Sequence, residues 1–343
     1  MTDTTSQMRR EVLEIPAAVD RLLTAGAPAI RAASAALRDR DPAFLTTVAR
    51  GSSDHVATYL KYVSELLLGV PVASVGPSVA SIYHAPLRLK GSACISISQS
   101  GKSPDIVELA RAAHQGGALT LALTNHPDSP LAEACAHPLD IHAGPENSVA
   151  ATKTFVNSAV AGLWLMAAWK QDADLTAAIH ALPPALEEAA ALDWSDLRAA
   201  LRGWNSLFTL GRGPAFAISN EAALKFKETC LIQAESYSSA EVMHGPVSIV
   251  GEGFPVLGFV ARDAAQPLLV DVADRLAEQG AVSFVTSGQA KKARCLPCVR
   301  TDHPLTDPIA LITSFYATVE RLAVSRGIDP DAPRHLKKVT ETV

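Results

Sequence analysis

The stretch that decides the fold is Ala93-Cys94-Ile95-Ser96-Ile97, followed by Ser98-Gln99-Ser100-Gly101-Lys102-Ser103 and then by Pro104-Asp105-Ile106-Val107-Glu108-Leu109. The first part is a short apolar run typical of a buried strand, and the last part has the apolar spacing of a helix. The serine-rich turn between them brings hydroxyl groups, an amide and backbone N–H groups to the start of a helix, which favours binding of a phosphate group. Serine and aspartate also cap helices, so the turn alone leaves a capping role open.

The composition limits the classes of function. The chain has 343 residues, of which 48% are hydrophobic, and this length predicts about two domains with a large core. The formal net charge of -5 gives no support for a nucleic acid or an anionic membrane as partner, although a phosphorylated metabolite needs only local donors. No apolar stretch is long enough to span a bilayer and the polar N-terminus lacks a signal-peptide core, so we expect a cytoplasmic protein.

The five cysteines do not suggest a disulfide framework, because their number is odd and they are widely spread. We expect them to be reduced. Cys295 and Cys298 have the spacing of half a zinc site or of a redox pair, but no second pair accompanies them. The role of this pair stays open.

The chain repeats one pattern in its two halves. Arg50-Gly51 and Arg212-Gly213 each follow a short apolar strand and precede a helix, and the same offset relates the strands near residues 93–97 and 255–260. Short strands rich in Val, Ile and Leu that alternate with helices predict parallel sheets covered by helices on both faces. The expected fold is α/β, with two tandem doubly wound α/β/α sandwich domains of the flavodoxin-like type.

We expect an N-terminal helical segment at residues 1–35, a first domain at residues 36–180, a second domain at residues 195–330 and a C-terminal tail at residues 331–343. The repeat is unequal at the serine-rich turn, because the second half has Val260-Ala261-Arg262 there. In a doubly wound sheet, ligands bind beyond the carboxyl ends of the strands. Ser52-Ser53, the turn at residues 98–103 and Thr124-Asn125 should therefore converge at one edge of the first sheet.

The second half carries a different group of ionisable residues. Glu221, Lys225 and Glu228 share one face of a predicted helix, and the alternative interpretation is a solvated face of salt bridges. His244 precedes Gly245-Pro246 in a predicted turn. A carboxylate and an imidazole suit proton transfer between adjacent carbons of a sugar phosphate, but a histidine in a loop is also an ordinary surface residue.

Several of these motifs together resemble the sugar isomerase (SIS) domain family, and within it the isomerase half of glucosamine-6-phosphate synthase. The resemblance covers nearly the whole chain from Met8 onward. The motifs are Arg50-Gly51-Ser52-Ser53, Ser98-Gln99-Ser100-Gly101, Ser148-Val149-Ala150-Ala151-Thr152-Lys153, residues 221–228, His244-Gly245-Pro246 and Pro333-Arg334-His335-Leu336-Lys337-Lys338.

The resemblance implies a role for each matching position. The residues implied to hold the phosphate of a hexose 6-phosphate are Ser98, Gln99, Ser100 and Ser103, and those implied to contact the sugar are Ser53, Val149 and Ala150. Glu228 is implied to be the base that moves a proton between C1 and C2, with Lys225 stabilising charge on the oxygens and Glu221 as a positioning residue.

The resemblance also implies a homodimer whose site lies at the subunit interface. His244 would assist ring opening from the neighbouring subunit, and Lys338 would engage the open-chain sugar, although a frayed basic tail is the alternative for this terminus. Two positions depart from the synthase: Ala151 replaces a serine beside the sugar, and Ser103 replaces a threonine in the phosphate loop.

The synthase has an N-terminal glutaminase domain, and this chain has no cysteine before Cys94 to serve as its nucleophile. The expected reaction is therefore deamination of glucosamine 6-phosphate with water to fructose 6-phosphate and ammonia. The resemblance implies that this route needs no metal ion, and we expect no other cofactor. Three alternatives stay open: an aminotransferase-like enzyme that uses free ammonia or a separate amidotransferase, a deaminase for another amino-sugar phosphate such as galactosamine 6-phosphate or a fructosamine phosphate, and a phosphosugar-sensing regulatory module.

Overall fold

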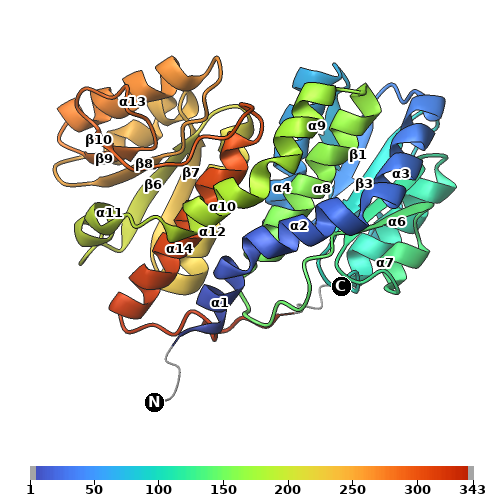
Figure 1. The fold of residues 1–343 in the computed structure, drawn as a ribbon, viewed down its shortest axis with the longest axis horizontal. Coiled ribbons are helices and arrows are strands. Elements are labelled where there is room, and N and C mark those ends of the chain that lie inside the picture. The colour runs from blue at the N-terminus through green and yellow to red at the C-terminus, as the bar shows by residue number, and fades with distance from the viewer. Residues whose placement is uncertain (1–4, 339–343) are drawn as a thin grey trace. The chain divides into compact units, whose positions relative to one another are not determined.

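The computed structural model describes residues 5–338, which form two five-stranded parallel sheets (Figure 1). Sheet A has the order β2-β1-β3-β4-β5, with β1 Leu45–Val48, β2 Val72–Ser74, β3 Ala93–Ile97, β4 Leu119–Thr124 and β5 His137–Asp140. Sheet B has the order β10-β9-β8-β6-β7, with β6 Ser206–Gly211, β7 Gln233–Ser238, β8 Pro255–Gly258, β9 Val282–Val285 and β10 Arg294–Cys295. The two orders are the same once β6 is matched to β1, β8 to β3 and β9 to β4, so the predicted repeat is confirmed.

The chain divides into two compact units, each built on one sheet. The sheet A unit comprises Ala17–Glu146, Lys153–His180 and the described residues from Leu336, and the sheet B unit comprises the described residues up to Pro16, Asn147–Thr152 and Ala181–His335. The N-terminal segment that we expected as one piece at residues 1–35 belongs to both units. Its helices are α1 Gln7–Leu13, α2 Ile15–Ala25 and α3 Ala27–Arg40.

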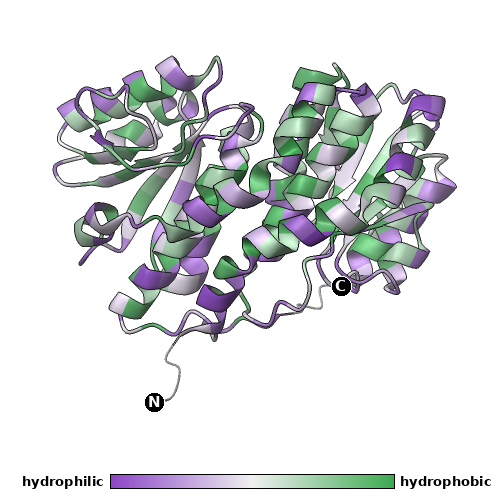
Figure 2. Cartoon of the chain, in the orientation of Figure 1, coloured by the Kyte–Doolittle hydropathy of each residue, from purple (hydrophilic) through white to green (hydrophobic). Residues whose placement is uncertain are grey.

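Helices cover sheet A because their apolar faces match its buried strands. The strand β3 is buried along its whole length, and the apolar face of α6 (Pro104–Gln115) packs in the same core. Figure 2 shows apolar residues along the strands of the sheet. The other helices of this unit after α3 are α4 Ser52–Leu67, α5 Ser78–Ser81, α7 Pro130–Glu133, α8 Lys153–Lys170 and α9 Ala173–His180. The helix α8 is almost wholly buried because it packs against both α3 and α4.

The sheet B unit is built in the same way. Its long helix α14 (Asp307–Ser325) corresponds to α8 and is buried along most of its length between α10 (Leu182–Ala191) and α12 (Pro214–Cys230). The remaining helical elements are α11 Ser195–Ala200, α13 Gln266–Glu278 and the 3-10 turns η1 Glu241–His244 and η2 Pro246–Ile249. Within residues 5–338, no helix is both long and apolar enough to cross a membrane.

Candidate active site

The serine-rich turn directly follows β3. The Ser98 hydroxyl accepts a hydrogen bond from the Gly101 N–H (3.2 Å), and the Ser100 hydroxyl accepts one from the Lys102 N–H (3.3 Å). A hydroxyl that accepts a hydrogen bond can still donate its own proton, so both serines keep a donor for a ligand. Ser103 occupies the N-cap position of α6 but its side chain makes no capping hydrogen bond. Helix capping therefore does not account for a serine side chain at position 103.

The loops after β1, β3 and β4 meet at the carboxyl edge of sheet A, because these strands are neighbours. The carbonyl oxygen of Gln99 accepts hydrogen bonds from the Asn125 N–H (3.1 Å) and from the Thr124 hydroxyl (3.4 Å). Ser53 lies in the first turn of α4, which begins directly after β1. The structure thus places Ser53 and the serine-rich turn on the same edge, where ligands bind in doubly wound sheets.

An ion pair connects β1 to the start of α6 at this edge. Both Nε and Nη2 of Arg50 donate to Oδ2 of Asp105, at 2.9 and 2.7 Å. The Asp105 side chain is fully buried, whereas about half of the Arg50 side chain is exposed. Arg50 marks the sequence repeat and belongs to one of the SIS-like motifs, but its partner could not be predicted from either. The pair shows what this residue does after β1: it neutralises a buried carboxylate beside the serine-rich turn.

Lys338 is held by a residue that the sequence analysis did not identify. Its Nζ donates to Oε2 of Glu146 at 2.8 Å, and the Glu146 side chain is fully buried. Glu146 also accepts hydrogen bonds from the Thr154 N–H (3.1 Å) and hydroxyl (2.6 Å). Lys338 is therefore not part of a frayed tail. Glu146 follows β5, and no spacing rule links it to a lysine at the other end of the chain.

In sheet B, the loop after β8 uses its hydrogen-bond donors on a carboxylate of the protein. The backbone N–H of Arg262 donates to Oδ2 of the buried Asp307 (2.9 Å), and Nε of Arg262 donates to the same oxygen (3.2 Å). Asp307 also accepts hydrogen bonds from the N–H and hydroxyl of Thr301. A carboxylate of the protein thus satisfies the donors of this loop, so only sheet A offers hydroxyl groups at this position.

Glu221, Lys225 and Glu228 form a buried charge network on α12, and the alternative of a solvated face is wrong for its first two members. Nζ of Lys225 lies 3.3 Å from Oε1 of Glu221 and 2.5 Å from Oε2 of Glu228, and the side chains of Glu221 and Lys225 are fully buried. The hydroxyl of Tyr316 on α14 donates to Glu221 Oε1 at 2.9 Å. The Glu228 side chain is 20% exposed, so this carboxylate is the member that a substrate can reach.

The charge on Lys225 follows from its neighbours. Burial acts to lower the pKa of Lys225, but the charges of Glu221 and Glu228 outweigh it and raise the pKa above its ordinary value. Lys225 is therefore an ammonium group at neutral pH and cannot act as a base. It can stabilise negative charge that develops beside it.

His244 lies at the opposite edge of sheet B from Glu228. It ends the 3-10 turn η1, which follows the carboxyl end of β7, and it is exposed. Glu228 lies in the last turn of α12, which runs back to the amino ends of the strands. The length of β7 and α12 separates the two side chains by on the order of 15–20 Å. One copy of this unit therefore does not bring Glu228 and His244 together.

Val149 and Ala150 lie in a loop that belongs to the sheet B unit and is held by α1. The buried carboxylate of Glu11 accepts hydrogen bonds from the Asn147 N–H (2.5 Å) and the Ser148 N–H (3.2 Å). Ala150 is buried and Val149 is half-buried. Glu11 is a second buried carboxylate that the sequence analysis missed, because it lies far from this loop in the chain.

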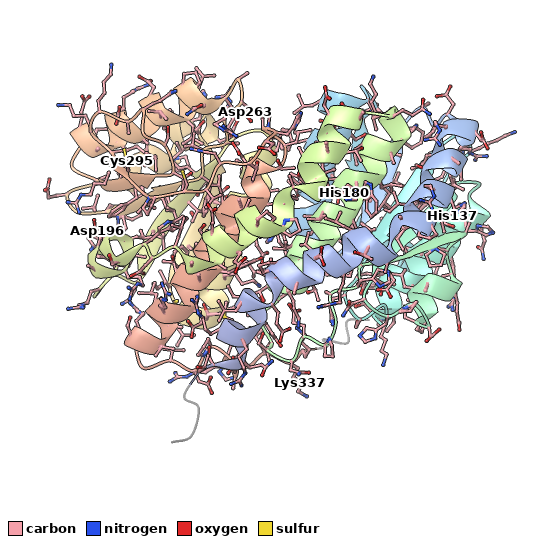
Figure 3. The ribbon with its side chains drawn as sticks, viewed as in Figure 1. His137, His180, Asp196, Asp263, Cys295 and Lys337 are labelled. Atoms are coloured by element: carbon pink, nitrogen blue, oxygen red, sulfur yellow. The ribbon has the colours of Figure 1, made fainter. Side chains whose placement is uncertain are left out.

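The cysteine pair contributes nothing to these groups. Both Cys295 and Cys298 are free thiols, and Cys295 is exposed on β10 (Figure 3). Burial raises the pKa of the Cys298 thiol, which donates to the Thr286 carbonyl (3.6 Å).

Comparison with known proteins assigns the family. The SIS domain model matches residues 41–168 and 200–293. The chain belongs to the SIS domain family. Each matched segment contains the first strand of one of the two sheets, so the SIS domain occurs twice in this chain.

The curated relatives of this SIS protein are isomerizing glutamine–fructose-6-phosphate aminotransferases. The one from Pyrobaculum aerophilum is 34% identical over 307 residues, which cover 85% of this chain and 50% of the relative, and the one from Sulfolobus acidocaldarius is 30% identical over 301 residues. The chain thus spans about half the length of the curated relatives that it matches.

Solved structures share the whole fold. A candidate phosphosugar isomerase from Silicibacter pomeroyi is 61% identical with a TM-score of 0.93, covering 95% of this chain and all of that chain. A glucosamine-6-phosphate deaminase from Thermotoga maritima has a TM-score of 0.79 at 18% identity, covering 98% of this chain and all of that chain, which shows the SIS fold alone.

Proposed function

We propose that this chain is an enzyme of the phosphosugar isomerase type, and that it deaminates an amino-sugar phosphate, with glucosamine 6-phosphate and water giving fructose 6-phosphate and ammonia. The observation that carries the proposal is the network of Glu221, Lys225 and Glu228, in which one partly exposed carboxylate is joined to a buried ammonium group. A module that only binds a phosphosugar needs the serine-rich turn but has no use for such a network.

In the proposed reaction, Glu228 removes the proton from C2 of the open-chain amino sugar. The electron pair forms a C1–C2 double bond, and Lys225 stabilises the negative charge that develops on the former aldehyde oxygen. A water molecule then gives this oxygen the proton that makes it a hydroxyl group. Glu228 then returns the proton to C1, which leaves an imine at C2. Water adds to this imine and ammonia leaves, so the product is the 2-keto sugar phosphate.

The phosphate group would be held by the serine-rich turn. The hydroxyl groups of Ser98, Ser100 and Ser103 can donate to its oxygens beside the start of α6, where the helix dipole favours an anion. The side chain of Gln99 adds an amide donor. Ser53 and the loop with Val149 and Ala150 are proposed to contact the sugar.

Lys338 and His244 are proposed to act on two different forms of the sugar. Lys338 is held by Glu146 and is proposed to bind the open-chain sugar. His244 is proposed to open the sugar ring in the site of a second copy of the chain, because it lies at the edge of sheet B opposite Glu228. The proposed enzyme is therefore a homodimer.

The proposal is tested by ammonia release from glucosamine 6-phosphate and galactosamine 6-phosphate, with formation of the keto sugar phosphate followed in parallel. Glu228→Gln keeps the shape of the side chain but removes the base, so we expect turnover to fall by about a hundredfold or more while substrate still binds. The control is Glu278→Gln, which changes an exposed carboxylate at the end of α13 and should leave turnover unchanged.

Ammonia release from one epimer, lost in Glu228→Gln, would establish the reaction and the sugar. Unchanged turnover in Glu228→Gln would refute the assigned base. Binding of both sugars without ammonia release would favour another amino-sugar phosphate, the reverse reaction with ammonia and fructose 6-phosphate, or a sensing role.

A further inference from the structure

A hollow in the sheet B unit is lined by none of the candidate site residues named above. It has a volume of about 670 Å³ and is lined by α11, by the residues that lead into β6, by Leu231 and by the end of α14. These elements lie at the side of sheet B where β6 and β7 begin. In Figure 1, α11 lies at the left and α14 runs down to the lower left, and the two helices are in contact; Asp196 marks α11 in Figure 3. We refer to this hollow as the α11 pocket.

The α11 pocket is lined by three arginines, Arg198, Arg202 and Arg326, and by no acidic residue among its described lining. The carboxylate of Asp193, beside the pocket, is shared between two guanidinium groups. It accepts from Nη2 of Arg198 (2.8 and 2.9 Å) and forms an ion pair with Arg321 (3.2 Å). Positive charge therefore exceeds negative charge around this pocket.

Two guanidinium donors near Asp193 are left without an acceptor, and one of them belongs to Arg198 in the pocket lining. Nε of Arg198 and Nη1 of Arg9 are buried, and neither has a hydrogen-bond partner within residues 5–338. Burial lowers the pKa of Arg9, and the nearby charge of Arg321 lowers it further, against the opposing charges of Glu320 and Asp193. Buried donors normally have partners, so a cluster that lacks them is suited to an added anion.

Helix ends offset only part of this charge. The helices α11, α12 and α14 all end at the pocket, and each contributes at most about half a negative charge. The described lining of the pocket contains three arginines, Arg198, Arg202 and Arg326, and no carboxylate, so its wall keeps more positive than negative charge.

The pocket combines fixed cations with an apolar wall. Nη1 of Arg326 donates to the Trp204 carbonyl (3.1 Å) and Nη2 to Oδ1 of Asn205 (3.0 Å), so this guanidinium group is held in place. The apolar part of the lining consists of Ala199, Leu231, Leu322 and Ile328. Guanidinium groups match phosphate and carboxylate oxygens, and apolar walls with few polar anchors are typical of sites for small organic ligands.

We propose that the α11 pocket binds a small organic anion that carries phosphate or carboxylate groups beside an apolar part. This proposal is independent of the proposed deamination, because the pocket shares no residue with the candidate active site. Leu231 has a left-handed backbone (φ 54°) and ends α12, the helix whose last turn carries Glu228. A ligand in this pocket would thus contact the end of that helix.

The test is isothermal titration calorimetry on the full chain with AMP, citrate and inorganic phosphate as probes. We expect AMP, citrate or both to bind, and inorganic phosphate to bind more weakly because it has no apolar part. Arg202→Gln should weaken the binding by about ten- to a hundredfold, since one charged donor is lost. Arg202 is exposed, so this variant should fold.

The matched control is Arg111→Gln, which removes the same charge from an exposed position on α6 in the sheet A unit. Binding of AMP alone would assign the pocket to phosphates, and binding of citrate alone would assign it to carboxylates. The proposal is overturned if neither probe binds, if Arg202→Gln has no effect on the binding, or if Arg111→Gln weakens it equally.

Discussion

At the scale of single residues, the candidate site is built on buried charges. The ammonium group of Lys225 is fully buried and is paired with two carboxylates, one of them fully buried as well. Such a network fixes the geometry of its members, because breaking one pair leaves an uncompensated charge away from water. Its members should therefore affect stability and activity together.

Lys225→Met tests this coupling. The substitution keeps much of the side-chain volume but leaves the buried Glu221 without its ammonium partner, so we expect a loss of about 3–5 kcal/mol in the free energy of unfolding. Lys227→Met on the same helix changes an exposed lysine and should shift stability by less than about 0.5 kcal/mol. Urea unfolding of both variants gives the comparison, and equal stabilities would contradict a buried network.

Glu146 is expected to act through Lys338, as a positioning residue. Glu146→Gln removes the charge that holds Nζ of Lys338 but keeps an acceptor for Thr154. In the proposed deaminase, we expect kcat to fall more than KM changes. We also expect Glu146→Gln and Lys338→Ala to be non-additive in kcat, because both break the same contact. Additive effects of the two substitutions would show that the contact has no part in turnover.

At the scale of elements, the turn between β3 and α6 depends on a glycine. Gly101 has φ +62°, and a Cβ atom there would overlap the side chain of Ser129. Its carbonyl accepts a hydrogen bond from the Leu131 N–H (3.1 Å), which ties the turn to α7. Both a left-handed backbone and close packing thus require glycine at this position.

Gly101→Ala should therefore lower the free energy of unfolding more than a substitution at a glycine where the added Cβ causes backbone strain but no steric overlap. Gly69 is the matched control, because it has φ +71° with open space around its Cβ position. We expect about 1–2 kcal/mol of destabilisation for Gly69→Ala and about 1–3 kcal/mol more for Gly101→Ala, with weaker phosphate binding in the latter alone. Thermal unfolding and phosphate titration measure both quantities, and equal losses would remove the packing argument.

At the scale of the whole molecule, the proposed site requires two copies of the chain. Glu228 and His244 lie at opposite edges of sheet B, so a substrate that uses both must take them from different subunits. The expected quaternary structure is a symmetric dimer with two equivalent sites. Light scattering after gel filtration measures this directly.

Mixing two inactive variants tests the shared site. Glu228→Gln and His244→Ala should each abolish most activity, but a co-expressed mixture contains mixed dimers in which one of two sites has both residues intact. We expect about a quarter of the wild-type activity to return. If mixed dimers form and remain inactive, Glu228 and His244 do not combine in one site across the subunit interface.

The sequence by itself determined the fold and most of the candidate residues. Apolar runs that alternate with helical spacing fix two parallel sheets, because this patterning acts over a few residues and repeats along the chain. The identities of the serine-rich turn, of Glu228 and of His244 were also available from the sequence alone. Their proposed roles stay predictions.

Only the tertiary structure decided which charges are buried and what they contact. Nothing in the spacing of Glu221, Lys225 and Glu228 separates a solvated face from a buried network, since both obey the same helical periodicity. The partners Glu146 for Lys338, and Glu11 for the loop at residues 147–152, join segments that are far apart in the chain. Burial and long-range contact are properties of the packed chain, because they depend on which elements meet, and no local pattern of residues encodes them.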